Sequence, residues 1–107
     1  MDFKLWRSKD VGVKLRPVPG PVPNSKQLGV AIRERREDQR LTIEQLAAKA
    51  GLDTSYLSGI ERLGRNPSWN KLARIFAALN IDGSELIERA EQIARNELRA
   101  SGELADT

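Results

Sequence analysis

Side chains that can hydrogen-bond to a polar ligand gather in one stretch of this sequence, between Thr54 and Asn66. Within it, LSGIERLGRNPS (residues 57–68) places Ser58 and Gly59 inside an apolar helical spacing and ends in basic residues. Hydroxyl and guanidinium groups donate hydrogen bonds to phosphate oxygens and to base edges. The stretch could therefore hydrogen-bond a polar ligand, and its small residues need an explanation, since Gly59 costs a helix about 1 kcal/mol relative to alanine.

The composition excludes several kinds of reactive centre. The 107 residues include neither cysteine nor histidine, which excludes disulfides, zinc fingers, thiol nucleophiles and serine–histidine triads. There is no glycine-rich phosphate loop, and a small helical domain leaves little room for a substrate cavity. We therefore predict a protein that is not an enzyme and that carries no cofactor or metal.

Charge and hydropathy indicate where such a protein acts. The formal net charge is +3, with an excess of basic residues up to residue 82 and an excess of acids over residues 83–107. A basic body favours nucleic acid through the release of counterions. There is no apolar run of the roughly 20 residues that a membrane span needs, and the first residues lack the apolar core of a signal peptide. We expect a cytoplasmic, nucleoid-associated protein that is not secreted.

Residues 1–24 are predicted to form a basic, non-helical extension. Apolar and polar residues alternate over residues 11–16, as in a short strand, and proline then occupies every second position over residues 17–23. Residues 3–6 (FKLW) combine two aromatic side chains with a leucine, whereas disordered tails are poor in aromatics. This extension either folds back on the domain or forms an arm that docks on a partner subunit, another protein or DNA.

From residue 25 onwards the sequence predicts five helices, so the fold class is all-α with a non-helical N-terminal extension. The helices are expected near residues 25–39, 43–50, 54–62, 69–79 and 83–100. Thr42 and Asp82 each begin a capping-box pattern, and Asp53 and Ser68 are expected to cap the third and fourth helices. The inward face of the fourth helix is predicted to consist of Trp69, Leu72, Ile75, Phe76 and Leu79.

The second and third predicted helices have the spacing of a helix-turn-helix unit. In TIEQLAAKAGLDTSYLSGIER (residues 42–62), Ala47 is small where the helices cross, and Gly51 can supply the positive φ of a tight turn. Apolar residues lie where both helices can share a core: Leu46, Ala50, Leu52, Leu57 and Ile60. In this arrangement the second helix of the unit is offered to the major groove of DNA.

These segments resemble the lambda-repressor/Cro-like helix-turn-helix domains, also described as the xenobiotic-response-element type. The resemblance covers about residues 28–87 and is carried by IRERRE, LTIEQLAAKAGL, SYLSGIE, RNPS and LARIFAALNI. It implies a five-helix DNA-binding domain over residues 25–87, with its motif at 43–62, followed by a helical extension and tail over 88–107. It also implies a transcriptional regulator, either a dimeric repressor or a controller-type protein, that binds a two-fold symmetric operator in double-stranded DNA.

The resemblance implies a role for individual residues of this interface. Contacts with backbone phosphates or the groove rim are implied for Thr42, the amide of Ile43, Tyr56, Arg65 and Asn66. The outward face of the recognition helix is implied to consist of Thr54, Ser55, Ser58 and Gly59. Because none of these four carries the paired donors of bidentate base readout, part of the specificity is expected from Arg62, Arg65 or the shape of the DNA.

Two further features have structural interpretations. Arg36 and Glu61 fall where the family pairs an arginine with a glutamate, which implies a clamp on the recognition helix; otherwise they are unrelated surface charges. Related domains usually place glycine directly after the ER of this helix, whereas here Leu63 precedes Gly64. The third helix is therefore expected to run one residue further, or Leu63 to enter the core.

A homodimer is expected because one such domain covers only a half-site. The N-terminal arm is one candidate contact. The other is an apolar stripe on the last helix, which can equally pack on the first helix of its own chain: Leu86, Ile87, Ala90, Ile93, Ala94 and Leu98. In the alternative to DNA binding, the protein is a bridging adaptor, a coactivator or an antitoxin that uses the helix-turn-helix module and the arm to bind another protein.

Overall fold

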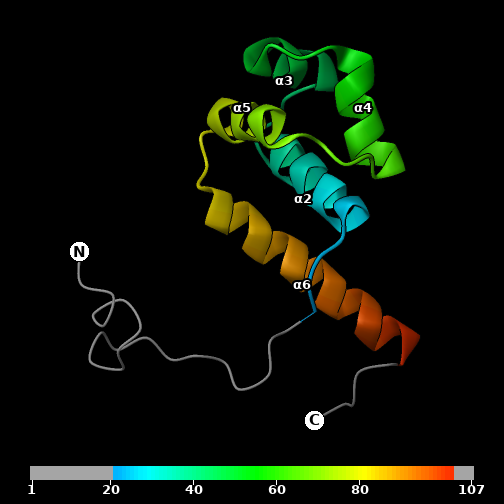
Figure 1. The fold of residues 1–107 in the computed structure, drawn as a ribbon. Helices are drawn as coiled ribbons and strands as arrows, with labels where there is room; N and C mark the ends of the chain where they lie inside the picture. The colour runs from blue at the N-terminus through cyan, green and yellow to red at the C-terminus, as the bar shows by residue number, and fades with distance from the viewer. Residues whose placement is uncertain (1–20, 103–107) are drawn as a thin grey trace, which may run out of the picture.

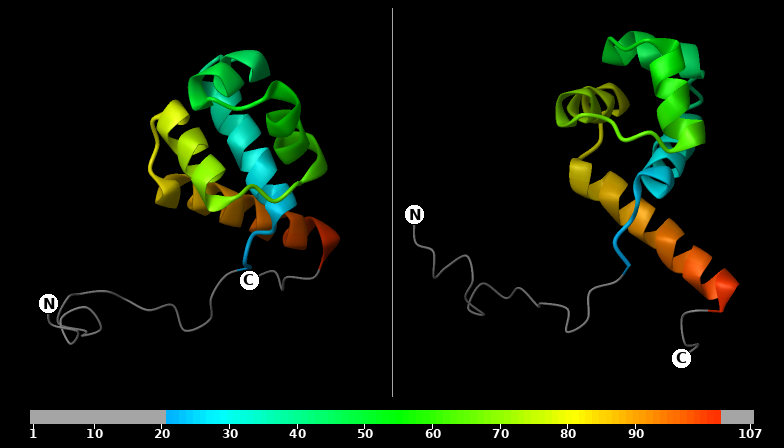
Figure 2. Two further views of the ribbon diagram at one scale, coloured as in Figure 1. Left: turned by 45° about the horizontal axis from the view of Figure 1, so that its top comes forward. Right: turned by 45° about the vertical axis from the view of Figure 1, so that its right-hand side comes forward.

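The computed structural model describes residues 21–102, and within that range it contains five α-helices and no strand. In chain order they are α2 (Ser25–Asp38), α3 (Ile43–Ala50), α4 (Thr54–Leu63), α5 (Trp69–Leu79) and α6 (Gly83–Ser101). α2 lies at the centre, with α3, α4 and α5 gathered on one side and α6 crossing on the other (Figures 1 and 2). The all-α prediction is confirmed, whereas the predicted strand and docking segment within residues 1–20 lie outside the described residues.

Local side-chain bonds explain where three of the helices begin. Asn24 and Thr42 each form a capping box with the glutamine three residues later, before α2 and α3 respectively. Ser68 accepts a hydrogen bond from the backbone N–H of Lys71 at the start of α5. Each cap satisfies an N–H group that has no partner inside its helix.

Both predicted aspartate caps lie at the N-cap positions, but their side-chain capping bonds are absent. Asp82 and Asp53 precede α6 and α4, but neither side chain accepts a capping hydrogen bond. The Asp53 carboxylate instead accepts a hydrogen bond from the hydroxyl of Ser55, at 2.7 Å. At α6 the N–H of Glu85 donates to the backbone carbonyl of Asp82, at 3.1 Å, so the predicted capping box is replaced by a main-chain bond.

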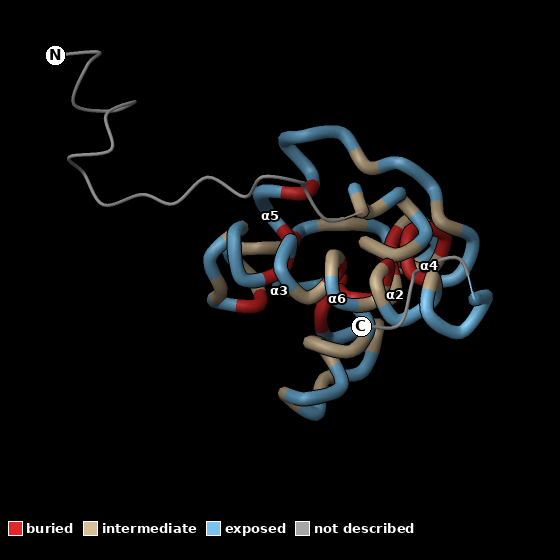
Figure 3. Tube along the Cα trace, turned by 90° about the horizontal axis from the view of Figure 1, so that it is seen from below, coloured by how far each residue is buried: buried red, intermediate tan, exposed pale blue. Residues whose placement is uncertain are grey.

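The core is built around α2, and every described helix contributes to it. Figure 3 shows the buried segments turned toward the centre of the bundle. The core cluster consists of Ala31, Ile32, Leu46, Ala47, Ala50, Leu57, Ile60, Leu72, Ile75, Leu79, Leu86 and Ala90. Burying a branched aliphatic side chain is worth about 1.5–3 kcal/mol, so these contacts hold the short α3 and α4 in place.

Trp69 does not belong to this core, which corrects the predicted inward face of α5. Its side chain lies at the first residue of α5 and is 71% exposed, because the helix meets the core only from Leu72 onwards. The indole ring contacts the partly buried Phe76 edge to face, with ring centres 6.4 Å apart. Trp69 is therefore a large apolar group on the surface.

α6 is a single helix that packs along α2 beyond residue 87. Leu86, Ala90 and Ala94 are buried within their own chain, so for these three residues the structure supports the second alternative, packing on α2. Arg89 strengthens this packing through ion pairs with Glu34, at 3.4 Å, and Asp38, at 3.1 Å. Of the predicted stripe, Ile93 and Leu98 are partly buried, and only Ile87 is classed as exposed.

α2 and α4 cross at a very short distance. A Cβ atom added to Gly29 of α2 would lie 2.1 Å from the backbone oxygen of Ile60 in α4. The two backbones therefore meet without an intervening side chain. No helix in the described part of the chain is long and apolar enough to cross a membrane.

Candidate nucleic-acid interface

The turn between α3 and α4 fixes the angle at which α4 is presented. Gly51 ends α3 in the left-handed conformation, with φ of 67°, which a residue with a Cβ adopts only at a cost. The N–H of Leu52 then donates to the carbonyl of Ala47, at 2.9 Å. The helix-turn-helix unit expected from the sequence is thus formed, and α4 lies along the edge of the molecule (Figures 1 and 2).

α4 separates a buried face from an open one. Leu57, Ile60 and Glu61 are buried. On the opposite side of the helix, residues spaced three and four positions from one another line a shallow hollow in the surface. The hollow is lined by Asp53, Ser55, Tyr56, Ser58, Gly59, Arg62, Leu63 and Arg65. It brings together six of the predicted contact residues and leaves out Thr54, Asn66, Thr42 and Ile43.

Gly59 lies on the side of α4 that lines the hollow, but its own atoms are covered. It is buried, and a Cβ placed on it would lie 2.9 Å from Cδ and 3.3 Å from Nε of Arg65. The backbone N–H of Arg65 also donates to the carbonyl of Gly59, at 3.2 Å. Gly59 is thus on the predicted outward face of α4, and in this structure the side chain of Arg65 covers it.

The late glycine lengthens α4 by one residue. The helix ends at Leu63, and Gly64 follows in the left-handed conformation with φ of 70°. Leu63 is 70% exposed and lines the hollow, so it does not enter the core. The hydroxyl of Ser25 donates to the carbonyl of Gly64, at 2.7 Å, which ties this end of α4 to the start of α2.

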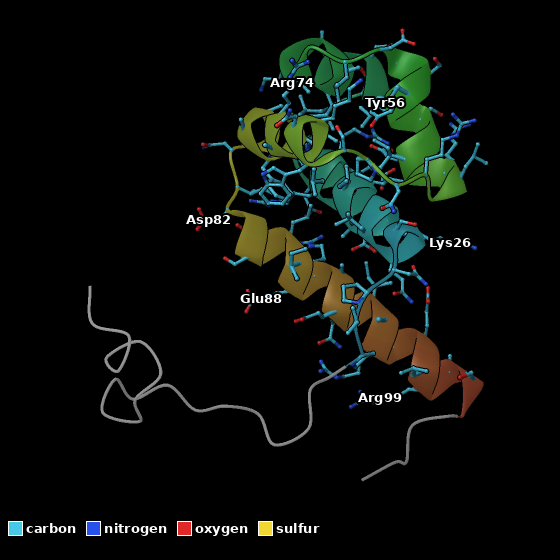
Figure 4. The ribbon with its side chains drawn as sticks, viewed as in Figure 1. Lys26, Tyr56, Arg74, Asp82, Glu88 and Arg99 are labelled. Atoms are coloured by element: carbon cyan, nitrogen blue, oxygen red, sulfur yellow. The ribbon has the colours of Figure 1, made fainter. Side chains whose placement is uncertain are left out.

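Tyr56 lies between α4 and α5 and is held from both sides (Figure 4). Its ring packs partly against the core, and the Lys71 ammonium of α5 lies 4.6 Å from the ring centre. This cation–π contact places a positive charge beside the hollow. No sequence pattern indicated Lys71, because it belongs to a different helix. The signal for Leu63 was the displaced glycine.

The start of α3 presents one hydroxyl and one backbone N–H of the predicted contact residues. The Thr42 hydroxyl is exposed but already accepts a hydrogen bond from the N–H of Gln45, at 3.0 Å. The Ile43 side chain packs against the core, so only its backbone N–H is available to a ligand. Asn66 is exposed in the loop after α4.

A nearly buried ion pair fixes α4 to α2, as the sequence predicts. Nε and Nη2 of Arg36 donate to the two carboxylate oxygens of Glu61, at 2.9 and 3.0 Å, and Nη1 donates to the carbonyl of Leu41, at 2.8 Å. The side chains are 12% and 1% exposed, respectively. The bond to Glu61 raises the pKa of Arg36, so its charge is present throughout the neutral range and is lost only at strongly alkaline pH.

Arg62 and Arg65 carry the positive charge that lines the hollow, and the Lys71 ammonium lies beside it. Neither of these two arginines has a carboxylate within ion-pair distance among residues 21–102, whereas Arg33, Arg35 and Arg89 of α2 and α6 do. In the same part of the chain there is no group of three acidic, histidine or cysteine side chains that could bind a metal ion. The hollow therefore presents arginines and hydroxyls, which suits a phosphate-rich ligand.

Comparison with known proteins identifies the fold family. The family model described as helix-turn-helix matches residues 32–86, just over half of the chain. The chain belongs to the lambda-repressor/Cro-like helix-turn-helix family. Among curated members, the immunity repressor protein of Bacillus phage phi105 is 39% identical over 74 residues, covering 64% of this chain and 51% of the repressor. The regulator SinR of Bacillus subtilis (strain 168) is 35% identical over 66 residues, covering 61% and 60%.

Solved helix-turn-helix structures show the same arrangement. The restriction-modification controller protein C.AhdI from Aeromonas hydrophila is 39% identical, with a TM-score of 0.55 and coverage of 57% of this chain and 92% of that one. C.Esp1396I bound to a 25 base pair operator site is 31% identical, with a TM-score of 0.59 and coverage of 64% and 92%. The chain spans about half the length of the phage repressor and about 60% of SinR.

Proposed function

We propose that this helix-turn-helix protein is a sequence-specific transcriptional regulator, a repressor or controller-type protein, that binds double-stranded operator DNA. The observation that carries the proposal is the open face of α4, where Arg62 and Arg65 have no acidic partner among residues 21–102. The buried Arg36–Glu61 pair holds this helix in place. Its relatives include a phage immunity repressor, and a structural neighbour is bound to an operator. The protein acts in the cytoplasm on nucleoid DNA and has no catalytic role.

In the proposed complex α4 enters the major groove and the surrounding groups hold the backbone. Thr42, the amide of Ile43, Tyr56 and Asn66 contact phosphates, and Lys71 adds a cation beside Tyr56. Phosphate contacts fix the position of the protein on the duplex, and groups in the groove read the sequence. The described part of the chain offers no observation that favours the bridging-adaptor alternative.

Salt dependence of binding tests the function directly. A duplex selected from a randomised pool is expected to lose about 1,000- to 100,000-fold in affinity between about 50 and 200 mM salt, as for complexes with about 6–10 phosphate contacts. Fluorescence anisotropy measures this slope. Arg62→Ala is expected to weaken binding, whereas Arg99→Ala removes the same charge at the far end of α6 (Figure 4) and is expected to leave it unchanged. Failure to bind any duplex at low salt contradicts the proposal.

We propose a homodimer, with Ile87 and Trp69 at its contact, since each domain covers one half-site. Phe76 links these groups, because it contacts the Trp69 ring and approaches Gly83, one turn before Ile87. Ile87→Glu is expected to dissociate the dimer at micromolar concentrations in sedimentation equilibrium. Gln92→Glu adds the same charge to α6 at another exposed position and is expected to leave the dimer intact. A dimer of Ile87→Glu as tight as the native one excludes this contact.

A further inference from the structure

Gly59 forms a seat for the side chain of Arg65. The aliphatic part of Arg65 crosses the helix where Gly59 lacks a Cβ, and the Arg65 N–H is bonded to the carbonyl of the same glycine. Two contacts with one residue, one from the backbone and one from the stem, fix the path of the arginine. Arg65 therefore lies along the open face of α4 instead of projecting beyond the end of the helix.

Apart from Arg62, the remaining groups on this face do not carry the paired donors of a bidentate contact to guanine. Ser55 and Ser58 each carry one hydroxyl, and that of Ser55 already donates to Asp53, at 2.7 Å. Two parallel donors in a fixed plane are what guanine recognition through O6 and N7 uses, and arginine supplies them. Arg62 also lines the hollow, but within the described residues no hydrogen bond or ion pair holds its side chain.

We propose that Arg65 reads a guanine in the major groove, and that Gly59 determines specificity by seating it. This inference rests on the proposed DNA-binding function and names the residue that supplies its base discrimination. Nε of Arg65 would be only 3.3 Å from a Cβ on Gly59, so the guanidinium group lies against the open face of α4. In the proposed complex this is the face that meets the base edges. The small residues of α4 thus make room for an arginine that comes from the following loop.

Base-by-base affinities of Arg65 variants test this assignment. The probes are the selected duplex and every single base-pair variant of it, at one salt concentration. Arg65→Ala is expected to weaken the selected duplex by about 5- to 150-fold and to abolish the preference at one G·C pair in each half-site, leaving other positions unchanged. Arg65→Lys keeps the charge but not the paired donors, and is expected to lose the same preference.

Lys71→Ala is the matched comparison for a contact with the backbone. It is expected to weaken all duplexes by the same factor, with every base preference retained. Arg99→Ala controls for the loss of one positive charge and is expected to bind like the native protein. If Arg65→Ala weakens binding to every duplex by the same factor and keeps all base preferences, Arg65 contacts a phosphate and the inference is wrong.

Gly59→Ala tests the seat without removing the arginine. The three atoms nearest to the added Cβ all belong to the flexible Arg65 side chain, at 2.9 to 3.6 Å, so that side chain can move aside. The thermal midpoint is therefore expected to stay level or rise, while the preference at the same G·C pair is lost. A Gly59→Ala protein with its base preferences unchanged contradicts the seat. The native protein is measured first. If it binds no duplex, the proposed function itself is wrong. If the native protein binds but Arg65→Ala loses affinity for all duplexes equally, only the role given to Arg65 is wrong.

Discussion

Arg36→Met is expected to lower the free energy of unfolding by about 3–5 kcal/mol, because it leaves a buried carboxylate without a partner. The Glu61 side chain is 1% exposed, and its carboxylate accepts hydrogen bonds from Arg36 alone among the described residues. The carbonyl of Leu41 also loses the donor that Nη1 supplies. Urea denaturation followed by circular dichroism gives the change in free energy.

The double variant Arg36→Met/Glu61→Leu separates the ion pair from the packing around it. Replacing a buried pair by apolar side chains of similar size is often neutral or stabilising, so this variant is expected to recover most of the loss. It also keeps the experiment informative where Arg36→Met alone does not fold. If the double variant is also unfolded, the loss of stability comes from packing at these positions and not from the unpaired carboxylate.

An exposed pair on the same helix provides the control. Arg33 and Glu37 lie 3.2 Å apart on α2, with side chains 52% and 54% exposed, and solvent screens such pairs. Arg33→Met removes the same functional group and is expected to change stability by no more than about 0.5 kcal/mol. If Arg36→Met costs no more than Arg33→Met, Arg36–Glu61 is not the clamp on the recognition helix.

The features predicted correctly from the sequence depend on short spacings or on the family resemblance. The capping box at Thr42 needs only residues three apart, so local chemistry is enough to predict it. The Arg36–Glu61 pair spans two helices and was found only because the resemblance placed both residues. Among these predictions, the five helices and the turn at Gly51 required no knowledge of the tertiary structure.

Apart from the missing capping bonds of Asp53 and Asp82, the predictions that were wrong or left open concern contacts between elements. Periodicity assigned Trp69 to the inward face of α5, but it cannot show that the core begins one turn later. It identified the apolar stripe of α6 without showing that α2 covers Leu86, Ala90 and Ala94. Gly59 lies on the predicted outward face of α4, yet what covers it comes from the next loop. In each case the periodicity indicated a face of the helix, but it did not show which element covers that face or where the contact begins.

Gly29 illustrates the same limit, since sequence patterns gave it no role and the structure places it at the tightest helix crossing. Gly29→Ala is expected to destabilise the protein by about 3 kcal/mol, the upper end of the cost of overpacking a core. The added Cβ would lie 2.1 Å from the oxygen of Ile60 and 3.3 Å from Cα of Glu61, both backbone atoms. Helix propensity favours alanine by about 1 kcal/mol and opposes this cost without cancelling it.

The same substitution at Gly59 provides the comparison that decides this prediction. Both glycines lie inside α-helices and neither has a positive φ, so alanine gains about the same propensity at each position. At Gly59 the obstructing atoms belong to the flexible Arg65 side chain, whereas at Gly29 they belong to the backbone of α4. Urea denaturation is therefore expected to give opposite signs, a loss at Gly29 and no loss at Gly59. Equal effects at the two positions mean that helix propensity alone governs both, and that α2 and α4 separate without cost.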